Sequence, residues 1–85
     1  MINSLRSNIP TLDLHGETRD IGLVLVKEFI CDNYKLKNKK IVIIHGKGQG
    51  IIKDMVHKEL RVNKLVQDYK IDSFNTGTTI VYLVN

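Results

Sequence analysis

The stretch KIVIIHGKGQG, residues 40–50, decides how the rest of the chain is interpreted. Its four consecutive β-branched residues, 41–44, are typical of a short buried strand. The strand pattern breaks at His45 into a glycine-rich loop, and IIKDMVHKEL then continues with helical spacing. A strand, a glycine-rich turn and a helix N-terminus in this order are typical of a phosphate-holding site, because the first helical N–H groups are free. The simpler interpretation is a tight turn alone, since spaced glycines are common. The glycines are Gly46, Gly48 and Gly50.

The size and charge of the chain limit the classes of protein that it can belong to. Eighty-five residues form one small domain, and 42% hydrophobic residues are enough for a single core. The net charge of +4 and the pI near 9.3 permit a polyanionic partner. Aromatic residues are 6% of the chain and Trp is absent, which argues against a domain that binds single strands mainly by stacking bases.

No segment of the sequence indicates secretion or a membrane. The single cysteine, Cys31, has no partner for an internal disulfide. There is no apolar run of about 18 residues and no secretory signal, so we expect a cytoplasmic protein without a membrane partner. Residues 1–9 are polar and are expected to form an N-terminal lead-in, and the domain is expected to cover residues 10–85.

The remaining patterns predict four strands and two helices. Thr18 is the expected cap of the first helix, whose apolar stripe is expected to be core. The fold class that follows is α/β, a two-layer β-α-β-α-β-β sandwich with a mixed four-stranded sheet. The predicted strands are 11–14, 40–45, 66–74 and 78–84, with helices at 19–36 and 51–63 and a hairpin turn at 75–77. The stripe consists of Ile21, Val24, Leu25, Val26, Phe29 and Ile30, and the second helix is expected to bury Ile52, Met55, Val56 and Leu60.

Basic side chains follow one side of the second helix at helical spacing. They form what we call the basic stripe, which is either a solvated outer face or a surface that follows a nucleic-acid backbone. A second group of lysines, at positions 37, 39 and 40, is most simply an exposed turn. The basic stripe consists of Lys53, His57, Arg61 and Lys64.

The ends of the first two strands are expected to share one crevice. A helix connects these strands, so they should run parallel and bring their carboxyl ends to one edge of the sheet. Asp13 and His15 end the first strand, and His45 with Lys47 follows the second. On an extended strand, Asp13 and His15 would point to the same side.

Phosphodiester cleavage is the chemistry that this set of residues indicates. The helix N-terminus, the amides of the glycine loop and Lys47 would hold the phosphate and stabilise its added charge. His15 would act as a general acid or base, and Asp13 would orient it or act as the base. For His45 two roles stay open, a second acid–base group or a structural residue that bonds to the backbone and holds the loop.

Metal chemistry fits the residues less well. Two-metal nucleases need several carboxylates, and a zinc site of Asp13, His15 and His45 lacks a spacing signature. No metal site and no required cofactor are therefore predicted, while a role for a divalent metal ion is left open. Cleavage without metal would favour RNA, whose 2′-hydroxyl can attack the neighbouring phosphate.

Three stretches resemble the signatures of the Smr (small MutS-related) domain, which occurs at the C-terminus of MutS2 proteins and as stand-alone chains. They are Leu12-Asp13-Leu14-His15-Gly16, Ile44-His45-Gly46-Lys47-Gly48-Gln49-Gly50 and Gly77-Thr78-Thr79-Ile80-Val81. The resemblance implies a sandwich similar to the C-terminal domain of translation initiation factor three. It also implies a domain that binds DNA or RNA and often acts as an endonuclease, in some members on ribosomes.

The resemblance also implies roles for particular residues. Asp13 and His15 match the motif tied to cleavage, and His45 falls in the motif tied to binding or catalysis. Taken together, the glycine loop, the basic stripe and the matched motifs give the predicted phosphate and nucleic-acid contacts, which are Gly46, Lys47, Gly48, Gly50, Lys53, His57, Arg61 and Thr79. The segment before the third motif is shorter here than in many members, although Gly77 and Thr79 match.

Two other functions fit the sequence to different degrees. The first is a non-catalytic module that binds nucleic acid or ribosomes through the same crevice. The second, a nucleotide-binding fold, fits poorly, because no Ser or Thr follows Lys47 and the glycine spacing differs from the dinucleotide fingerprint.

Overall fold

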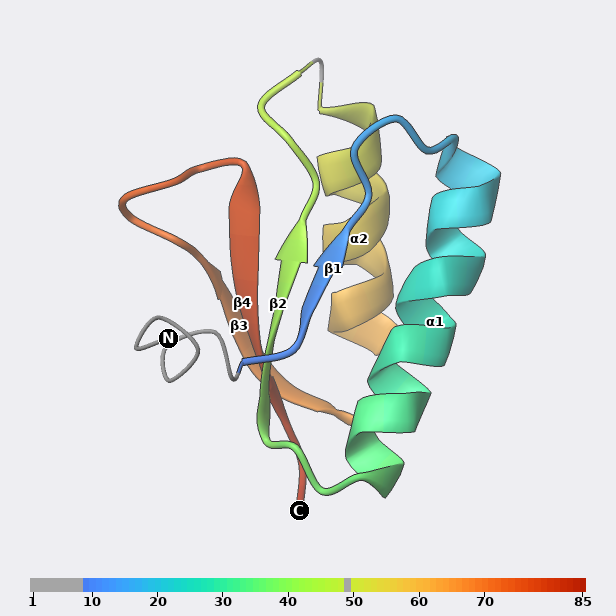
Figure 1. Cartoon of the computed structure of the whole chain (residues 1–85), viewed down its shortest axis with the longest axis vertical. Coiled ribbons are helices and arrows are strands. Elements are labelled where there is room, and N and C mark those ends of the chain that lie inside the picture. Colours follow the sequence, from blue (N-terminus) through green and yellow to red (C-terminus); the bar gives the residue numbers. More distant parts are fainter. Residues whose placement is uncertain (1–8, 49) are drawn as a thin grey trace, which may run out of the picture.

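The computed structural model describes residues 9–48 and 50–85, which form one four-stranded sheet covered on one face by two helices (Figure 1). The strand order is β1-β2-β4-β3, with β1 parallel to β2 and the other neighbours antiparallel. This confirms the predicted β-α-β-α-β-β sandwich with a mixed sheet. The predicted lead-in, except for Ile9, lies outside the described residues. The elements are β1 (Thr11–Asp13), α1 (Arg19–Lys35), β2 (Lys40–Ile44), α2 (Ile51–Val62), β3 (Val66–Ile71) and β4 (Thr78–Leu83).

Side-chain hydrogen bonds are present at both ends of helix α1. The Thr18 hydroxyl accepts the N–H of Ile21 at 3.2 Å, as predicted for the N-cap, and Asp20 adds a favourable charge to the first turn. At the other end the Asn38 side chain donates to that of Asn33, and Lys37 has a φ of 64°. The left-handed residue turns the chain into β2.

The apolar face of α1 is narrower than predicted. Ile21 and Val24 are 52% and 55% exposed, so the expectation that they belong to the core is wrong. The buried line runs instead through Gly22, Val26 and Ile30. A Cβ at Gly22 would lie 2.9 Å from Met55 Cε, so the glycine allows α2 to approach closely. This approach decides which side of α1 is covered.

Helix α2 buries Met55, Val56 and Leu60 as expected, and Ile52 packs partly buried against them.

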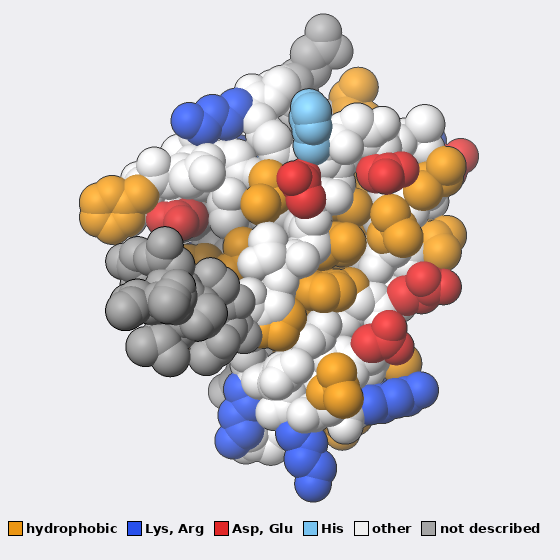
Figure 2. Space-filling view, in the orientation of Figure 1, with side chains coloured by type: hydrophobic (Ala, Val, Ile, Leu, Met, Phe, Trp, Pro, Cys, Tyr) orange, Lys and Arg blue, Asp and Glu red, His pale blue; other side chains and the backbone are white. Residues whose placement is uncertain are grey.

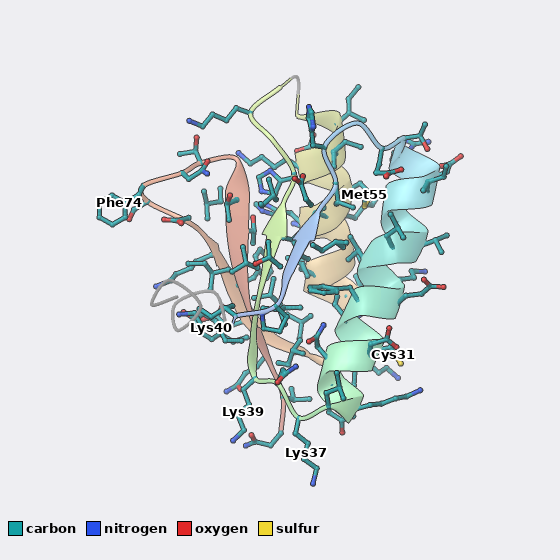
Figure 3. All side chains as sticks on the ribbon, in the orientation of Figure 1. Cys31, Lys37, Lys39, Lys40, Met55 and Phe74 are labelled. Atoms are coloured by element: carbon teal, nitrogen blue, oxygen red, sulfur yellow. The ribbon has the colours of Figure 1, made fainter. Side chains whose placement is uncertain are left out.

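Strand β3 ends three residues before the predicted position. Asp72 Oδ1 accepts the N–H of Phe74 at 2.9 Å, which turns the chain away from β4. Phe74 is 96% exposed and points into solvent (Figure 3). A hydrogen bond of 3.0 Å from Thr78 N–H to the Asn75 carbonyl closes the predicted hairpin turn.

No helix within residues 9–48 and 50–85 is long and apolar enough to cross a membrane.

The register of the sheet assigns each side chain to one of two faces. Partners in register share a face, so Asp13 lies on the same side as Ile44 and Thr78, the open side of the sheet. Ile43 and Thr79 are partners on the other side, under the helices, where both are fully buried. This alternation decides which of the predicted site residues can meet.

Candidate functional site

The predicted convergence of two strand ends is confirmed for the backbone. β1 and β2 run parallel, and the Leu14 N–H donates to the Ile44 carbonyl at 2.8 Å, immediately before His15 and His45. Both motifs therefore leave the sheet at the same edge. The side chains separate there, because Asp13 is exposed on the open face and His45 is only 6% exposed under the helices.

Asp13 and His15 form an exposed pair at the end of β1. The carboxylate of Asp13 accepts the backbone N–H of His15 at 2.9 Å, which makes a tight turn that continues through Gly16 with a φ of 83°. In the described part of the chain, no hydrogen bond joins the His15 ring to Asp13 or to another side chain. Asp13 and His15 are both exposed. Both groups are open to a ligand.

The glycine loop, residues 46–50, leads into the N-terminus of α2. Gly50 is the N-cap, with a φ of 89° that favours glycine, and it offers no side chain to the first-turn N–H groups. A hollow of about 200 Å³ lies beside it. This volume is below the roughly 300–1,000 Å³ of small-molecule pockets and suits a single phosphate group. The lining residues are His45, Gly46, Gly48, Gly50, Ile51, Ile52 and Lys53.

Gly77 holds the base of the glycine loop. Its carbonyl accepts the N–H groups of both His45 and Gly46 at 2.9 Å. A Cβ at Gly77 would lie 3.1 Å from the Gly46 carbonyl carbon, so the two backbones are in close contact. The Gly46 N–H is therefore already used within the domain, and the groups left for an anion lie further along the loop and in the first turn of α2.

A buried hydrogen-bond network lies under the loop. Thr79 Oγ1 is 2.8 Å from His45 Nε2 and 2.8 Å from His57 Nε2. His45 Nδ1 is 3.1 Å from the Gly46 carbonyl oxygen. Both ring nitrogens of His45 are thus bonded inside the domain, which favours the structural one of its two predicted roles. We call His45, Thr79 and His57 the histidine–threonine chain.

The electrostatic surroundings favour the neutral form of both histidines of the histidine–threonine chain. Burial lowers the pKa of His45 below its ordinary value, and the charge of Lys53 lowers it further against the opposing effect of the Gly46 carbonyl. Burial also lowers the pKa of His57, with added repulsion from His45, Lys53 and Arg61 that outweighs the attraction of Asp54. A neutral imidazole can accept a hydrogen bond, which a protonated one cannot.

The basic stripe divides into exposed and inward-facing members. Arg61 and Lys64 are exposed and Lys53 is half-buried beside the glycine loop. His57 instead turns inward, where its ring centroid is 5.3 Å from that of Tyr69 on β3. The stripe that can meet a polyanion is therefore Lys53, Arg61 and Lys64.

The lysines before β2 belong to a different part of the surface. Lys37 and Lys39 lie at the end of the molecule opposite the glycine loop (Figure 3), where Lys and Arg side chains gather (Figure 2). They cannot serve the same phosphate as Lys47 and Lys53.

The described residues do not assemble a metal site. No three His, Cys, Asp or Glu side chains in residues 9–48 and 50–85 lie close enough together to hold one ion. The alternative zinc site of Asp13, His15 and His45 is not formed, because its members lie on two faces of the sheet.

Sequence reasoning missed the contacts that join the loop to β4. Gly77 was predicted only as a match to a motif, while Thr79 and His57 were predicted as nucleic-acid contacts; Thr79 is fully buried and the ring of His57 packs inward against Tyr69 instead. A buried polar pattern was available as a signal, because Thr79 occupies an inward position of a strand that is otherwise apolar there, with Val81 and Leu83.

Comparison with known proteins gives one family. A protein-family model described as the Smr domain matches residues 12–85. Two relatives named Endonuclease MutS2 are similar in sequence. The protein from Caldanaerobacter subterraneus subsp. tengcongensis is 33% identical over 93% of this chain, and that from Ligilactobacillus salivarius is 36% identical over 86%. The match covers 10% of each relative, so this chain spans about a tenth of their length.

Two solved structures share the fold. The Smr domain of Thermus thermophilus MutS2 has a TM-score of 0.87 at 25% identity, over 91% of this chain and 100% of that domain. YdaL, a stand-alone small MutS-related protein from Escherichia coli, has a TM-score of 0.86 at 24% identity, over 99% of this chain and 74% of that protein.

Proposed function

The chain belongs to the Smr domain family, and we propose that it binds nucleic acid at the glycine loop and cleaves phosphodiester bonds of RNA or DNA with Asp13 and His15. The relatives are named endonucleases, but they are about ten times longer than this chain. Cleavage by this domain therefore needs support from its own residues.

The observation that carries the proposal is that the strand end with the exposed Asp13–His15 turn lies beside the strand end that leads into the glycine loop and its hollow. The hollow lies at the uncapped N-terminus of α2, where the helix dipole favours an anion. Lys53 lines it, and Lys47 is exposed on the loop. The hydrogen bond from Leu14 to Ile44 places the two strand ends side by side. We propose that a strand whose phosphate sits in the hollow continues past this edge of the sheet to Asp13 and His15.

Asp13 and His15 supply a proton acceptor and a proton donor. On RNA, one group takes the proton of the 2′-hydroxyl, and the 2′-oxygen attacks phosphorus. The 5′-oxygen leaves with a proton from the other group, which gives a cyclic phosphate and a free hydroxyl. On DNA, water takes the place of the 2′-hydroxyl. The lysines and the α2 N–H groups would stabilise the added negative charge.

His45 is proposed as the residue that holds the loop rather than as an acid or base. Its Nδ1 faces the Gly46 carbonyl and its Nε2 faces Thr79, so neither nitrogen is free for substrate. The phosphate contacts are assigned to Lys47, Gly48, Gly50 and Lys53, with Arg61 extending the surface.

One experiment tests the proposed function. Wild type, Asp13→Asn and His15→Ala are incubated with labelled single-stranded RNA and with labelled DNA, with and without excess chelator. We expect the wild type to cleave and both variants to bind without cleaving. Cyclic phosphate ends in the presence of chelator indicate the metal-free route, and loss of cleavage on chelation shows that a divalent metal ion takes part. Equal cleavage by wild type and both variants would refute the assigned roles.

A non-catalytic module that binds nucleic acid or ribosomes is the second candidate. The observation that favours it is that Asp13 bonds to the backbone of His15 and not to its ring, so no preformed acid–base pair exists in the described structure. Binding without cleavage by the wild type, under every condition above, would select this candidate.

A further inference from the structure

We infer that His57 and Thr79 are positioning residues, which hold the glycine loop through His45 in a hydrogen-bond chain of fixed direction. The existence of this histidine–threonine chain does not depend on what the domain binds. Its consequence for anion binding rests on the proposed function.

The direction of the chain follows from its last acceptor. The Gly46 carbonyl can only accept, so His45 Nδ1 must carry a proton and donate to it. In neutral His45 the other nitrogen, Nε2, is then an acceptor. Within residues 9–48 and 50–85, its hydrogen-bond partner is the Thr79 hydroxyl, at 2.8 Å, which can donate to it.

The same reasoning assigns the proton of His57. The Thr79 hydroxyl has one hydrogen, which it gives to His45, so its oxygen must accept at the other contact. His57 Nε2, also at 2.8 Å, is therefore protonated and donates. The complete order is His57 Nε2–H to Thr79 Oγ1–H to His45 Nε2, and His45 Nδ1–H to the Gly46 carbonyl.

The position of the chain lets it control the loop. Thr79 is fully buried on β4 and cannot exchange its partners for water. His45 is held by its ring at both nitrogens and by its N–H to the Gly77 carbonyl. The first residues of the glycine loop are thereby tied to the sheet, whereas Lys47 and Gly48 are exposed. Loss of the Thr79 hydroxyl would leave a buried histidine nitrogen unpaired.

The groups around the chain favour its neutral state. Helix α2 contributes Lys53, Asp54 and Arg61. The two cations disfavour a positive charge on His57, and the carboxylate of Asp54 opposes them. Strand β3 contributes the Tyr69 ring, and the two histidine rings meet edge to face with centroids 5.6 Å apart. A proton on His45 Nε2 would turn the acceptor into a donor and leave the Thr79 hydrogen without its partner.

The test uses Thr79→Val, which removes the hydroxyl and keeps the shape, and Thr79→Ser, which keeps the hydroxyl. Thr78→Val is the matched control, because Thr78 is the adjacent buried residue of β4 and faces the open side of the sheet. Imidazole nitrogen and backbone amide NMR spectra are recorded for each protein at neutral pH. Affinity is measured with a fluorescein-labelled single-stranded RNA and a DNA oligonucleotide.

We expect the wild type to show His45 protonated at Nδ1 and His57 protonated at Nε2. Thr79→Val should lose these tautomers, shift the amides of Gly46 and Gly48, and weaken oligonucleotide binding about tenfold. Thr79→Ser should keep the wild-type tautomers, loop amide shifts and oligonucleotide affinity. Thr78→Val should change none of these three. Because His57 is half-buried, His57→Leu provides a second variant if Thr79→Val does not fold, and it should shift the His45 ring signals.

Other tautomers in the wild type, or loop amides unchanged in both Thr79→Val and His57→Leu, would overturn the inference. If the wild type binds neither oligonucleotide, the proposed function fails. The NMR spectra of the imidazole nitrogens and of the loop amides then still decide whether the histidine–threonine chain exists.

Discussion

Asp13 and His45 lie at the ends of neighbouring parallel strands, yet their side chains are on opposite faces of the sheet. Asp13 shares the open face with its register partner Ile44, while His45 bonds to Thr79 beneath the helices. The two residues therefore cannot form one acid–base pair across the strand ends. Asp13 with His15 is left for chemistry, and His45 for the structure of the loop.

This division predicts different stabilities for two histidine substitutions. His45→Ala leaves Thr79 without its acceptor in a buried position and should lower the free energy of unfolding by about 2–3 kcal/mol. His15→Ala removes an exposed ring and should change it by less than about 0.5 kcal/mol. Urea denaturation of both variants and the wild type measures the difference. Equal effects would contradict the assignment of His45 to the loop.

Stability should decrease in mild acid. Burial lowers the pKa values of His45 and His57, so between about pH 6.5 and these lowered values the unfolded chain binds more protons than the folded domain. The stability is complete above the unfolded pKa and is lost as the pH falls through the folded pKa values. Urea midpoints measured between about pH 7.5 and about pH 5 follow this loss.

His57→Gln gives the control for the pH dependence. Glutamine can donate to Thr79 and does not titrate, so the loss in acid should be smaller than in the wild type. A pH dependence that is unchanged in His57→Gln would show that this histidine does not contribute.

Gly77→Ala should disturb the glycine loop through the backbone. The new methyl group would lie 3.1 Å from both the Gly46 carbonyl carbon and Lys47 Cγ, so the loop has to move. We expect a loss of about 1–3 kcal/mol in the free energy of unfolding. Gly48→Ala is the matched control, since a Cβ there meets no described atom within 4 Å, and it should cost less than about 0.5 kcal/mol. Thermal or urea unfolding separates the two.

The basic stripe should contribute to binding in proportion to its contacts with phosphates. Lys53→Glu with Arg61→Glu should weaken oligonucleotide binding, and each lost phosphate contact should reduce the salt-dependence slope by about 0.7–0.9. Lys37→Glu with Lys39→Glu makes the same change of charge at the opposite end of the molecule. This control should keep the slope of the wild type. An equal effect of both pairs would show that only net charge matters.

Much of the architecture could be predicted because its determinants are local. The β-branched run 41–44 and the Thr18 cap decide their elements through neighbours in the chain, and the helix between β1 and β2 requires them to run parallel. The apolar stripe of α1 was predicted too broadly, because the close approach of Met55 to Gly22 depends on another helix. The end of β3 was missed because an aspartate side chain competes with the strand for the backbone.

The amino-acid sequence by itself determined the order of the elements, the meeting of two motifs at one edge of the sheet and the family. Only the tertiary structure decided which face each of those side chains occupies. The contacts of Thr79 with His45 and His57 span 34 and 22 residues, and they depend on strand register and on the position of α2. Hydrogen bonds between such distant residues leave no periodic signal, so the loop-holding role of His45 emerges only when the chain is folded.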